Sequence, residues 1–328
     1  MDGSSTWKSI DNSTCTVDPV PESLAIAALV LCFLTVFGNS LVVIAIVKDP
    51  YRELKTIPNY LILNLAVCDL IVGIPSELLL GLLPFIPPQK SSLYGNLYFV
   101  AYTSLYFAMV ASSLTILTLA FERYIMVEAP FRSKEFLVHS HLKLSIVYIW
   151  LLAACAALLS LLNQCNEKEY RLIIVDAVGF PAMVFMFIIY SRIFYLVRKC
   201  IRQDLENSLE SSGSSLLASD DFNENVRRRE REIAMSVFLF VGAFALCWTP
   251  CFVMENIFYK ASKEKRLSLE TPADWVRFSG LLSSLLNPVI YALRYGKFRR
   301  AVRAIFRSYC GRTHRFSVLS EEFIRPVV

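Results

Sequence analysis

The stretch TLAFERYIMVEAPFR, residues Thr118–Arg132, closes an apolar run that begins near Asn96. The run ends on a charged pair, Glu122 and Arg123, and then continues hydrophobically through Ile125–Val127. A mostly apolar run of roughly 17–25 residues is long enough to cross a membrane as a helix. The charged pair is then either an anchor at the membrane surface or a latch whose strength something else controls.

The composition of the whole chain is that of a membrane protein. Of its 328 residues, 55% are hydrophobic and only 19% are charged, and the mean hydropathy is +0.49. Soluble domains average about 25% charged residues. Seven segments share the length and apolar character of a membrane span: Leu24–Val47, Ile57–Leu83, Asn96–Val127, Leu144–Leu162, Leu172–Val197, Ile233–Tyr259 and Trp275–Leu293. The sequence therefore predicts an all-α membrane protein, a seven-transmembrane helix bundle.

The distribution of lysine and arginine predicts the orientation of this bundle. If the N-terminus lies outside the cell, most of these residues fall in the inner loops and the C-terminal tail. Positive charge accumulates in the cytoplasmic loops of membrane proteins. We therefore expect a multi-pass protein of the plasma membrane with an extracellular N-terminus and a cytoplasmic C-terminus.

The orientation divides the chain into an extracellular arm (1–23), the helix bundle (24–294) and a cytoplasmic tail (295–328). Within the bundle, residues 200–230 form the longest inner loop, and their serine, glycine and acidic content predicts a flexible segment. The tail begins with a basic stretch in which four apolar residues share one helical face: Phe298, Val302, Ile305 and Phe306. This pattern predicts a short amphipathic helix in the membrane interface.

Candidate modification sites lie mainly in the terminal parts of the chain. Asn12 heads an Asn-Ser-Thr sequon on the side expected to be extracellular, which predicts glycosylation. Cys310 follows the amphipathic stretch and is a candidate for palmitoylation. Cys15 and Cys165 are the two cysteines in outer segments, and they could form a disulfide in an oxidising compartment.

Asp69 is the residue inside a span that most needs an explanation. It lies within LNLAVCDLIVG, about 18 Å from the inner end of its span at 1.5 Å per residue. A charge at bilayer depth costs about 2.5–3.5 kcal/mol. Further polar side chains predicted at a similar depth are Asn39, Ser112, Ser283, Ser284 and Asn287. An acid in this setting could hold a proton or a small cation, and the alternative is a neutral, hydrogen-bonded structural acid.

Prolines inside the spans predict kinks, because each removes a backbone hydrogen bond. The four that we place within spans are Pro75, Pro181, Pro250 and Pro288. The last two are flanked by Trp248 and Tyr291, which suggests hinges in the sixth and seventh spans.

Several short motifs occur in a fixed order along the spans. They are GNSLV at Asn39, LNLAVCDL at Asp69, FERY at Phe121–Tyr124, Trp150, FALCWTP at Phe244–Pro250 and NPVIY at Asn287–Tyr291. In order and spacing, this set resembles the rhodopsin-like (class A) G-protein-coupled receptors. The resemblance implies a receptor that binds an extracellular ligand and activates heterotrimeric G proteins. It further implies arrestin and receptor kinases as partners, no enzyme activity and no nucleic acid.

The resemblance also implies roles for individual residues. Arg123 would pair with Glu122 and with Glu230 at the base of the sixth span and be released on activation, so the charged pair is interpreted as a latch. The other switch residues implied are Tyr124, Phe244, Trp248, Pro250, Asn287, Pro288 and Tyr291. Asp69 would bind a sodium ion, an allosteric modulator, within a polar core that includes Asn39, Ser112, Ser283, Ser284 and Asn287.

Three departures from the family pattern reduce the number of subfamilies to which the chain could belong. Tyr98 stands where most relatives have a bridging cysteine, a feature shared with melanocortin, lysophospholipid and cannabinoid receptors. Leu105 stands at the position of the amine-receptor aspartate, which argues against a monoamine. Leu281 stands at the position of the opsin lysine, so no retinal cofactor is expected.

Charged residues near the outer span ends suggest where a ligand binds. They are Glu77, Asp176, Glu255, Asp274 and Arg277. The wall expected below them consists of Leu105, Tyr106, Met109, Trp248 and Phe252. Four acids against one arginine suggest a cationic ligand such as a basic peptide, with Glu77 and Glu255 reachable from water. An anionic lipid gripped by Arg277 is the alternative, and so are solvated helix ends with Glu77 and Arg277 paired internally.

Two other classes of membrane protein fit the sequence less well. A transporter would be expected to show duplicated halves, and the seven spans show no repeat. A serine-type intramembrane protease needs a histidine at depth, but His139, His141 and His314 all fall on the inner side.

Overall fold

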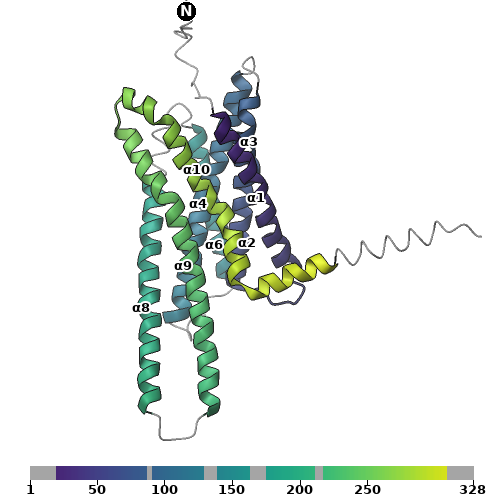
Figure 1. Cartoon of the computed structure of the whole chain (residues 1–328), viewed down its shortest axis with the longest axis vertical. Helices are drawn as coiled ribbons and strands as arrows, with labels where there is room; N and C mark the ends of the chain where they lie inside the picture. The colour runs from purple at the N-terminus through teal and green to yellow at the C-terminus, as the bar shows by residue number, and fades with distance from the viewer. Residues whose placement is uncertain (1–19, 87–90, 129–138, 163–174, 211–216, 309–328) are drawn as a thin grey trace, which may run out of the picture.

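The computed structural model of the chain describes residues 20–86, 91–128, 139–162, 175–210 and 217–308. Within these ranges, seven helical segments are long and apolar enough to cross a membrane, which confirms the predicted bundle. The main helices run α1 (Glu22–Lys48), α2 (Ile57–Ile71), α4 (Ser91–Glu128), α6 (His139–Leu162), α8 (Phe180–Glu210), α9 (Leu217–Lys260) and α10 (Lys263–Arg294). Figure 1 shows them side by side, with residues 296–308 forming a further helix across the end of the bundle.

The outward surface of the bundle is apolar, as a lipid-facing surface must be. Phe33, Phe187 and Leu246 are 69%, 71% and 75% exposed. Side chains of this kind would be costly to hold in water, but they are ordinary contacts for lipid tails.

The second span is interrupted at its proline. After α2 comes a π-helical segment, η1 (Val72–Glu77), and then the short helices α3 (Leu78–Leu82) and η2 (Leu83–Phe85). Pro75 lies inside η1 and has no N–H to donate, so a wider turn at this point accommodates the missing bond.

The fifth span begins in the same way. The π-helical segment η5 (Val175–Gly179) immediately precedes Pro181 in α8. Pro250 and Pro288, by contrast, lie within continuous α-helical assignments in α9 and α10.

The seventh span begins earlier than predicted. α10 starts at Lys263, where the side chain of Ser262 caps the helix by accepting a bond from Lys265 N at 3.4 Å. Glu264 in the first turn favours this end of the helix because of the helix dipole. Asp274, which the sequence analysis placed near the outer end of this span, therefore lies inside the helix.

The ends of α8 and α9 that are predicted to be cytoplasmic extend well beyond the other helices (Figure 1). We call this predicted cytoplasmic end of the bundle the inner end and the opposite one the outer end. The loop predicted as flexible over residues 200–230 is helical through Glu210 and again from Leu217. Leucine, arginine and glutamate in these segments favour helix, so both spans continue past the expected membrane boundary.

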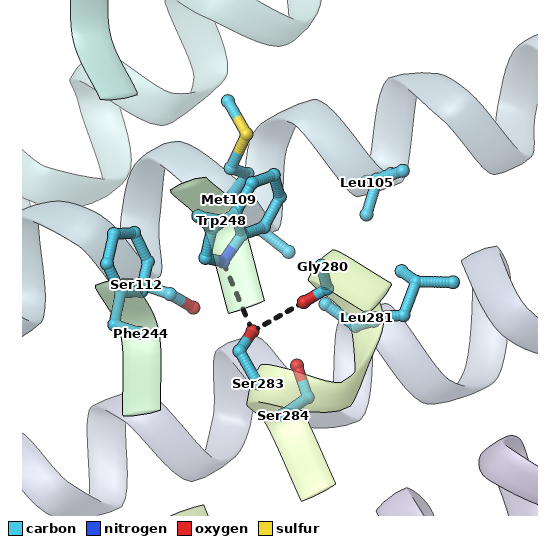
Figure 2. A pocket seen from close by; sticks show the side chains of 11 residues that line it. Leu105, Met109, Ser112, Phe244, Trp248, Gly280, Leu281, Ser283 and Ser284 are labelled. Carbon is cyan, nitrogen blue, oxygen red and sulfur yellow. Dashed lines mark hydrogen bonds between the residues drawn. The ribbon is translucent and has the colours of Figure 1, made fainter. Parts of the chain in front are cut away.

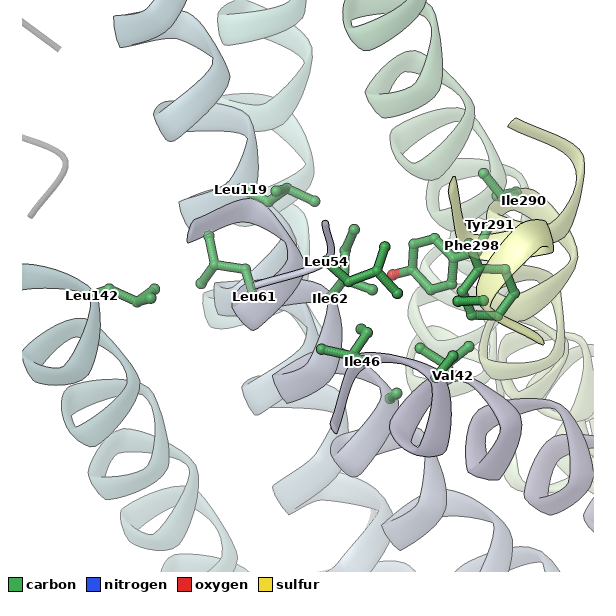
Figure 3. Close-up of a cluster of buried hydrophobic side chains, with 13 residues drawn as sticks. Val42, Ile46, Leu54, Leu61, Ile62, Leu119, Leu142, Ile290, Tyr291 and Phe298 are labelled. Carbon is green, nitrogen blue, oxygen red and sulfur yellow. The ribbon is translucent and has the colours of Figure 1, made fainter. Parts of the chain in front are cut away.

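A buried cluster at the inner end joins α1, α2, α4 and α10 to the helix over 296–308. Figure 3 shows Ile62 and Val42 on the side of Tyr291, with Phe298 beside Tyr291, and Leu61 farther off toward Leu119 and Leu142. The rings of Tyr291 and Phe298 are 6.4 Å apart between centroids. The predicted amphipathic face is confirmed for Phe298, Val302 and Ile305, which pack on this cluster, while Phe306 is 49% exposed.

Candidate functional site

The centre of the bundle is organised around Asp69. Its carboxylate is 1% exposed, and Oδ2 accepts a hydrogen bond from Asn287 Nδ2 at 2.8 Å. This bond joins α2 to α10 at the depth that the sequence analysis predicted to be near the middle of the membrane. The arrangement brings together the two residues that the sequence analysis placed at the same depth.

Asn39 compensates for the proline of the seventh span. Pro288 has no N–H, so the carbonyl of Ser284, four residues earlier, lacks its helical donor. Asn39 Nδ2 donates to that carbonyl at 3.1 Å, and to Thr35 O at 3.0 Å. Glycine at position 38 allows α1 to approach α10 closely enough for this bond. A Cβ at Gly38 would lie only 2.8 Å from Pro288 Cγ.

A small cavity of about 20 Å³ lies above this polar core. Figure 2 shows Ser112, Trp248, Ser283 and Ser284 around it, and Leu105, Met109 and Phe244 complete part of its wall. A water molecule needs about 10–15 Å³. The cavity therefore has room for a water molecule or a small ion, whereas sites for organic ligands span roughly 300–1,000 Å³.

The oxygen atoms around Asp69 fit a hard monovalent cation. Two buried atoms here, Ser112 Oγ and Asn39 Oδ1, have no hydrogen-bond partner among the described residues. These two oxygens and the Asp69 carboxylate are atoms of the kind that hard cations prefer as ligands. In the part of the chain that the structure describes, no three His, Cys, Asp or Glu side chains gather as a transition-metal site would require.

An aromatic column on α9 faces the cavity. The ring centroid of Trp248 is 5.9 Å from that of Phe244 and 6.5 Å from that of Phe252. Trp248 Nε1 donates to Ser283 Oγ at 3.3 Å, and Ser283 Oγ donates to Gly280 O at 2.7 Å (Figure 2).

Two glycines make room for this column, and the sequence analysis did not single them out. A Cβ at Gly280 would lie 3.4 Å from the Trp248 ring, and one at Gly179 would lie only 2.6 Å from the Phe252 ring. Glycine at a helical position is a detectable signal, but the aromatic partner on another helix is not visible in the sequence.

At the inner end, Arg123 contacts its neighbour as the resemblance implied. Arg123 Nε and Glu122 Oε2 are 2.8 Å apart, in a charge contact that lacks aligned hydrogen-bond geometry, and both side chains are buried. The backbone of Glu230 is part of α9, but its side chain is outside the described residues. Tyr124 is half-buried, and the centroid of its ring lies 6.4 Å from that of Phe121.

At the outer end, Arg277 joins two acids. Its Nε is 2.6 Å from Glu255 Oε1 and its Nη1 is 2.7 Å from Asp274 Oδ1. The guanidinium also lies 5.1 Å from the centroid of the Phe258 ring. A second polar link, Asn256 Nδ2 to Asp176 Oδ1 at 2.9 Å, connects α9 to η5.

Glu77 is not part of this outer cluster. It is 0% exposed and lies against α1, where Thr35 Oγ1 donates to Glu77 Oε1 at 3.5 Å. The expectation that Glu77 and Glu255 are reachable from water is wrong, because helix packing buries Glu77 and Glu255 is 5% exposed in its pair with Arg277. Glu77 and Arg277, which the sequence analysis suggested could be paired internally, have different partners: Arg277 contacts Glu255 and Asp274, and Glu77 contacts Thr35.

The predicted pocket wall is divided in the structure. Leu105, Met109 and Trp248 line the cavity, whereas Tyr106 packs into a cluster with residues of α6. Phe252 contacts Trp248 and the position of Gly179.

The candidate modification and disulfide sites, Asn12, Cys15, Cys165 and Cys310, lie outside the described residues.

The described residues thus form a seven-helix bundle with a buried central acid, Asp69, and a charged pair, Glu122 and Arg123, at one end. The chain belongs to the 7 transmembrane receptor (rhodopsin family), whose family model matches residues 38–291. It is a receptor and not an enzyme.

Among curated proteins, the chain is similar to receptors of several subfamilies. It is 26% identical to the histamine H2 receptor of Cavia porcellus over 87% of this chain and 79% of that receptor. It is 26% identical to trace amine-associated receptor 9 of Rattus norvegicus over 93% of this chain and 96% of that receptor. It is 28% identical to neuromedin-U receptor 2 of the same species over 90% of this chain and 77% of that receptor. These similarities leave the subfamily unresolved and do not support the melanocortin, lysophospholipid or cannabinoid likeness.

Proposed function

We propose that this receptor lies in the plasma membrane with its N-terminus outside and responds to an extracellular ligand that carries positive charge, with a basic peptide preferred. Its inner end, around Arg123, would then engage a heterotrimeric G protein, with arrestin and receptor kinases acting on the same face and tail.

The observation that carries the ligand class is the charge balance of the outer cluster. Arg277 is shared between Glu255 and Asp274, so the three side chains together carry one net negative charge. Asp176 adds a further acid on η5. An anionic lipid head would have to compete with two carboxylates for Arg277, whereas a cationic ligand would be attracted by those two acids.

A small amine is the second candidate ligand. Its support is the similarity to receptors named for histamine and trace amines. Leu105 in the cavity wall offers an amine no counter-ion, which is why a peptide with charge at the outer cluster is preferred.

The size of the cavity implies that the ligand opens the outer bundle. A space of about 20 Å³ takes a water molecule but not an organic ligand. We infer that ligand entry parts the outer ends of α9 and α10 from their neighbours, and that Trp248 transmits this movement to Asn287 through Ser283.

We also propose that a sodium ion at Asp69 modulates the receptor. Asp69, Ser112 and Asn39 would supply oxygen ligands, and the ion would supply the positive charge that the buried acid otherwise lacks. Ion binding would favour the packing of α2 against α10 that the structure describes.

The decisive experiment is guanine-nucleotide exchange on a panel of purified G proteins, with the receptor reconstituted in lipid vesicles. Three ligand sets are compared: basic peptides, small amines and anionic lysolipids. We expect exchange to rise with members of the first set. A response confined to anionic lysolipids would contradict the proposed ligand class, and no exchange with any ligand on any G protein would contradict the proposed coupling.

A further inference from the structure

Glu77 is a buried acid that the sites above leave without a role. Its side chain is fully buried where η1 packs on α1, and protein atoms alone cover it. Oε1 accepts the long bond from Thr35 Oγ1, at 3.5 Å, and Oε2 has no hydrogen-bond partner within the described residues. An ionised carboxylate in such a place would lack both water and a counter-charge.

The elements packed against Glu77 bring no positive charge to it. The charged residues of α1 are Glu22 and Lys48, at its two ends, and α3 has none. The charged residues of α4 all lie in its last turns, and on the η1 side of α4 the contact is the hydroxyl pair Ser76–Ser104.

Of the titratable groups near Glu77, Asp69 opposes its ionisation, and the thiol of Cys32 brings no positive charge that could stabilise the carboxylate. Cys32 on α1 and Asp69 on α2 are close enough to interact with it electrostatically. Asp69, when ionised, repels a second negative charge. Arg123 and Arg277, which form ion pairs inside the described bundle, are held by other acids.

The surroundings of Glu77 suit a proton better than a metal ion. Hard cations such as Ca²⁺ and Mg²⁺ take about six or more oxygen ligands. Here one carboxylate and one distant hydroxyl are present, beside apolar groups such as Leu29 and Val36 that pack against the same stretch of the second span. A proton requires only the carboxylate itself, and leaving its hydroxyl unbonded costs less than leaving a charge unpaired.

We propose that Glu77 is an intramembrane proton-binding site, which carries a proton on Oε2 while α1 and η1 are packed together. Release of the proton requires water to reach the carboxylate, and therefore requires α1 to part from η1. Since the packed arrangement binds the proton more tightly, acidification favours it, and alkaline conditions favour an opened interface.

Infrared spectroscopy of the purified full-length receptor in lipid vesicles tests this directly. A protonated carboxylic acid shows a carbonyl stretch that shifts between H₂O and D₂O. We expect one such band at neutral pH to disappear in Glu77→Gln and to persist in the matched variant Asp69→Asn. An identical spectrum in the parent and in Glu77→Gln would overturn the proposal.

Two further measurements keep the test decisive if Glu77→Gln is poorly folded. Thr35→Val removes the hydroxyl that contacts Oε1, so the band should shift in frequency, whereas Thr35→Ser should restore it. The alternative is that Glu77 holds a metal cation. In that case the band would be missing in the parent, and sodium would raise thermal stability in the parent and in Asp69→Asn but not in Glu77→Gln. None of these readouts requires a ligand or a G protein, so their failure is distinct from failure of the proposed receptor function.

Discussion

Asn287 Nδ2 donates to Asp69 Oδ2 at 2.8 Å, joining two residues 218 positions apart in the sequence. The bond lies between the cavity beside Trp248 and the inner cluster that contains Tyr291, one helical turn below Asn287. Any movement of α10 relative to α2 must stretch or break it. The pair therefore links the region beside the cavity to the inner cluster, and we propose that an event at the outer end acts on the inner end through it.

The first prediction concerns the proposed sodium ion. Ser112→Ala should reduce the effect of sodium on agonist affinity, and Asp69→Asn should abolish it, because each removes an oxygen ligand. Coupling between two sites typically amounts to about 1–3 kcal/mol, or roughly 5–150-fold in affinity, and is reciprocal. The measurement is agonist affinity in a sodium buffer and in a buffer with a large organic cation, and the ratio of the two affinities is compared between the variants and the parent.

Ser113→Ala is the matched control for this prediction. Ser113 is buried beside Ser112, but its hydroxyl already donates to Met109 O at 2.8 Å within its own helix. If Asp69→Asn responds to sodium as the parent does, Asp69 is a structural acid and the ion site is refuted.

The second prediction concerns the pair at the inner end. Glu122→Gln should raise ligand-independent nucleotide exchange, because Arg123 loses the charge that holds it in the packed state. Glu230→Ala should act in the same direction if its side chain also contacts Arg123. Basal exchange is compared at equal surface expression, with Glu128→Gln, an exposed acid at the end of α4, as control. Unaltered basal exchange in both variants would argue for an anchor instead of a latch.

The third prediction separates a cationic from an anionic ligand. Glu255→Gln should weaken a basic peptide by about tenfold, roughly 1.4 kcal/mol, because the outer cluster loses its excess negative charge. Arg277→Ala should leave peptide affinity unchanged or higher, although it destabilises the fold by leaving Glu255 buried without its partner. Competition binding gives the affinities, with Glu264→Gln at the exposed start of α10 as control. The reverse ranking, in which Arg277→Ala abolishes binding, would establish an anionic ligand.

The fourth prediction concerns the packing of the Phe252 ring, part of the aromatic column, against Gly179. Gly179→Ala places a methyl group 2.6 Å from the Phe252 ring and should destabilise the receptor by about 1–3 kcal/mol through overpacking. Gly242→Ala on α9 is the matched control, since its Cβ meets nothing within 4 Å among the described atoms and should be neutral or stabilise by up to about 1 kcal/mol. Thermal unfolding in detergent distinguishes them, and equal midpoints for both variants would contradict the packing argument.

The sequence alone was sufficient for the number of spans and for the residues of the polar core. Apolar runs of spanning length carry this information because a membrane admits a backbone only when its hydrogen bonds are satisfied locally, as in a helix. Asp69 and Asn287 could be placed at one depth by counting residues, since every residue of an α-helix rises by the same amount. Glu122 and Arg123 are adjacent in the chain, so their contact did not depend on another helix.

Which way a side chain faces was decided by the tertiary structure. Glu77 and Glu255 both lie near outer span ends, yet the π-helical turn around Pro75 and the packing of α1 turn Glu77 toward Thr35, while Glu255 meets Arg277 from the neighbouring helix. A helix in a membrane can be polar on any side that a partner covers, so apolar sequence does not reveal its rotation. The depth of a residue in its span follows from covalent geometry, but the direction of its side chain follows from packing. In this receptor, packing separates Glu77, a buried acid, from the outer cluster that is proposed to receive the ligand.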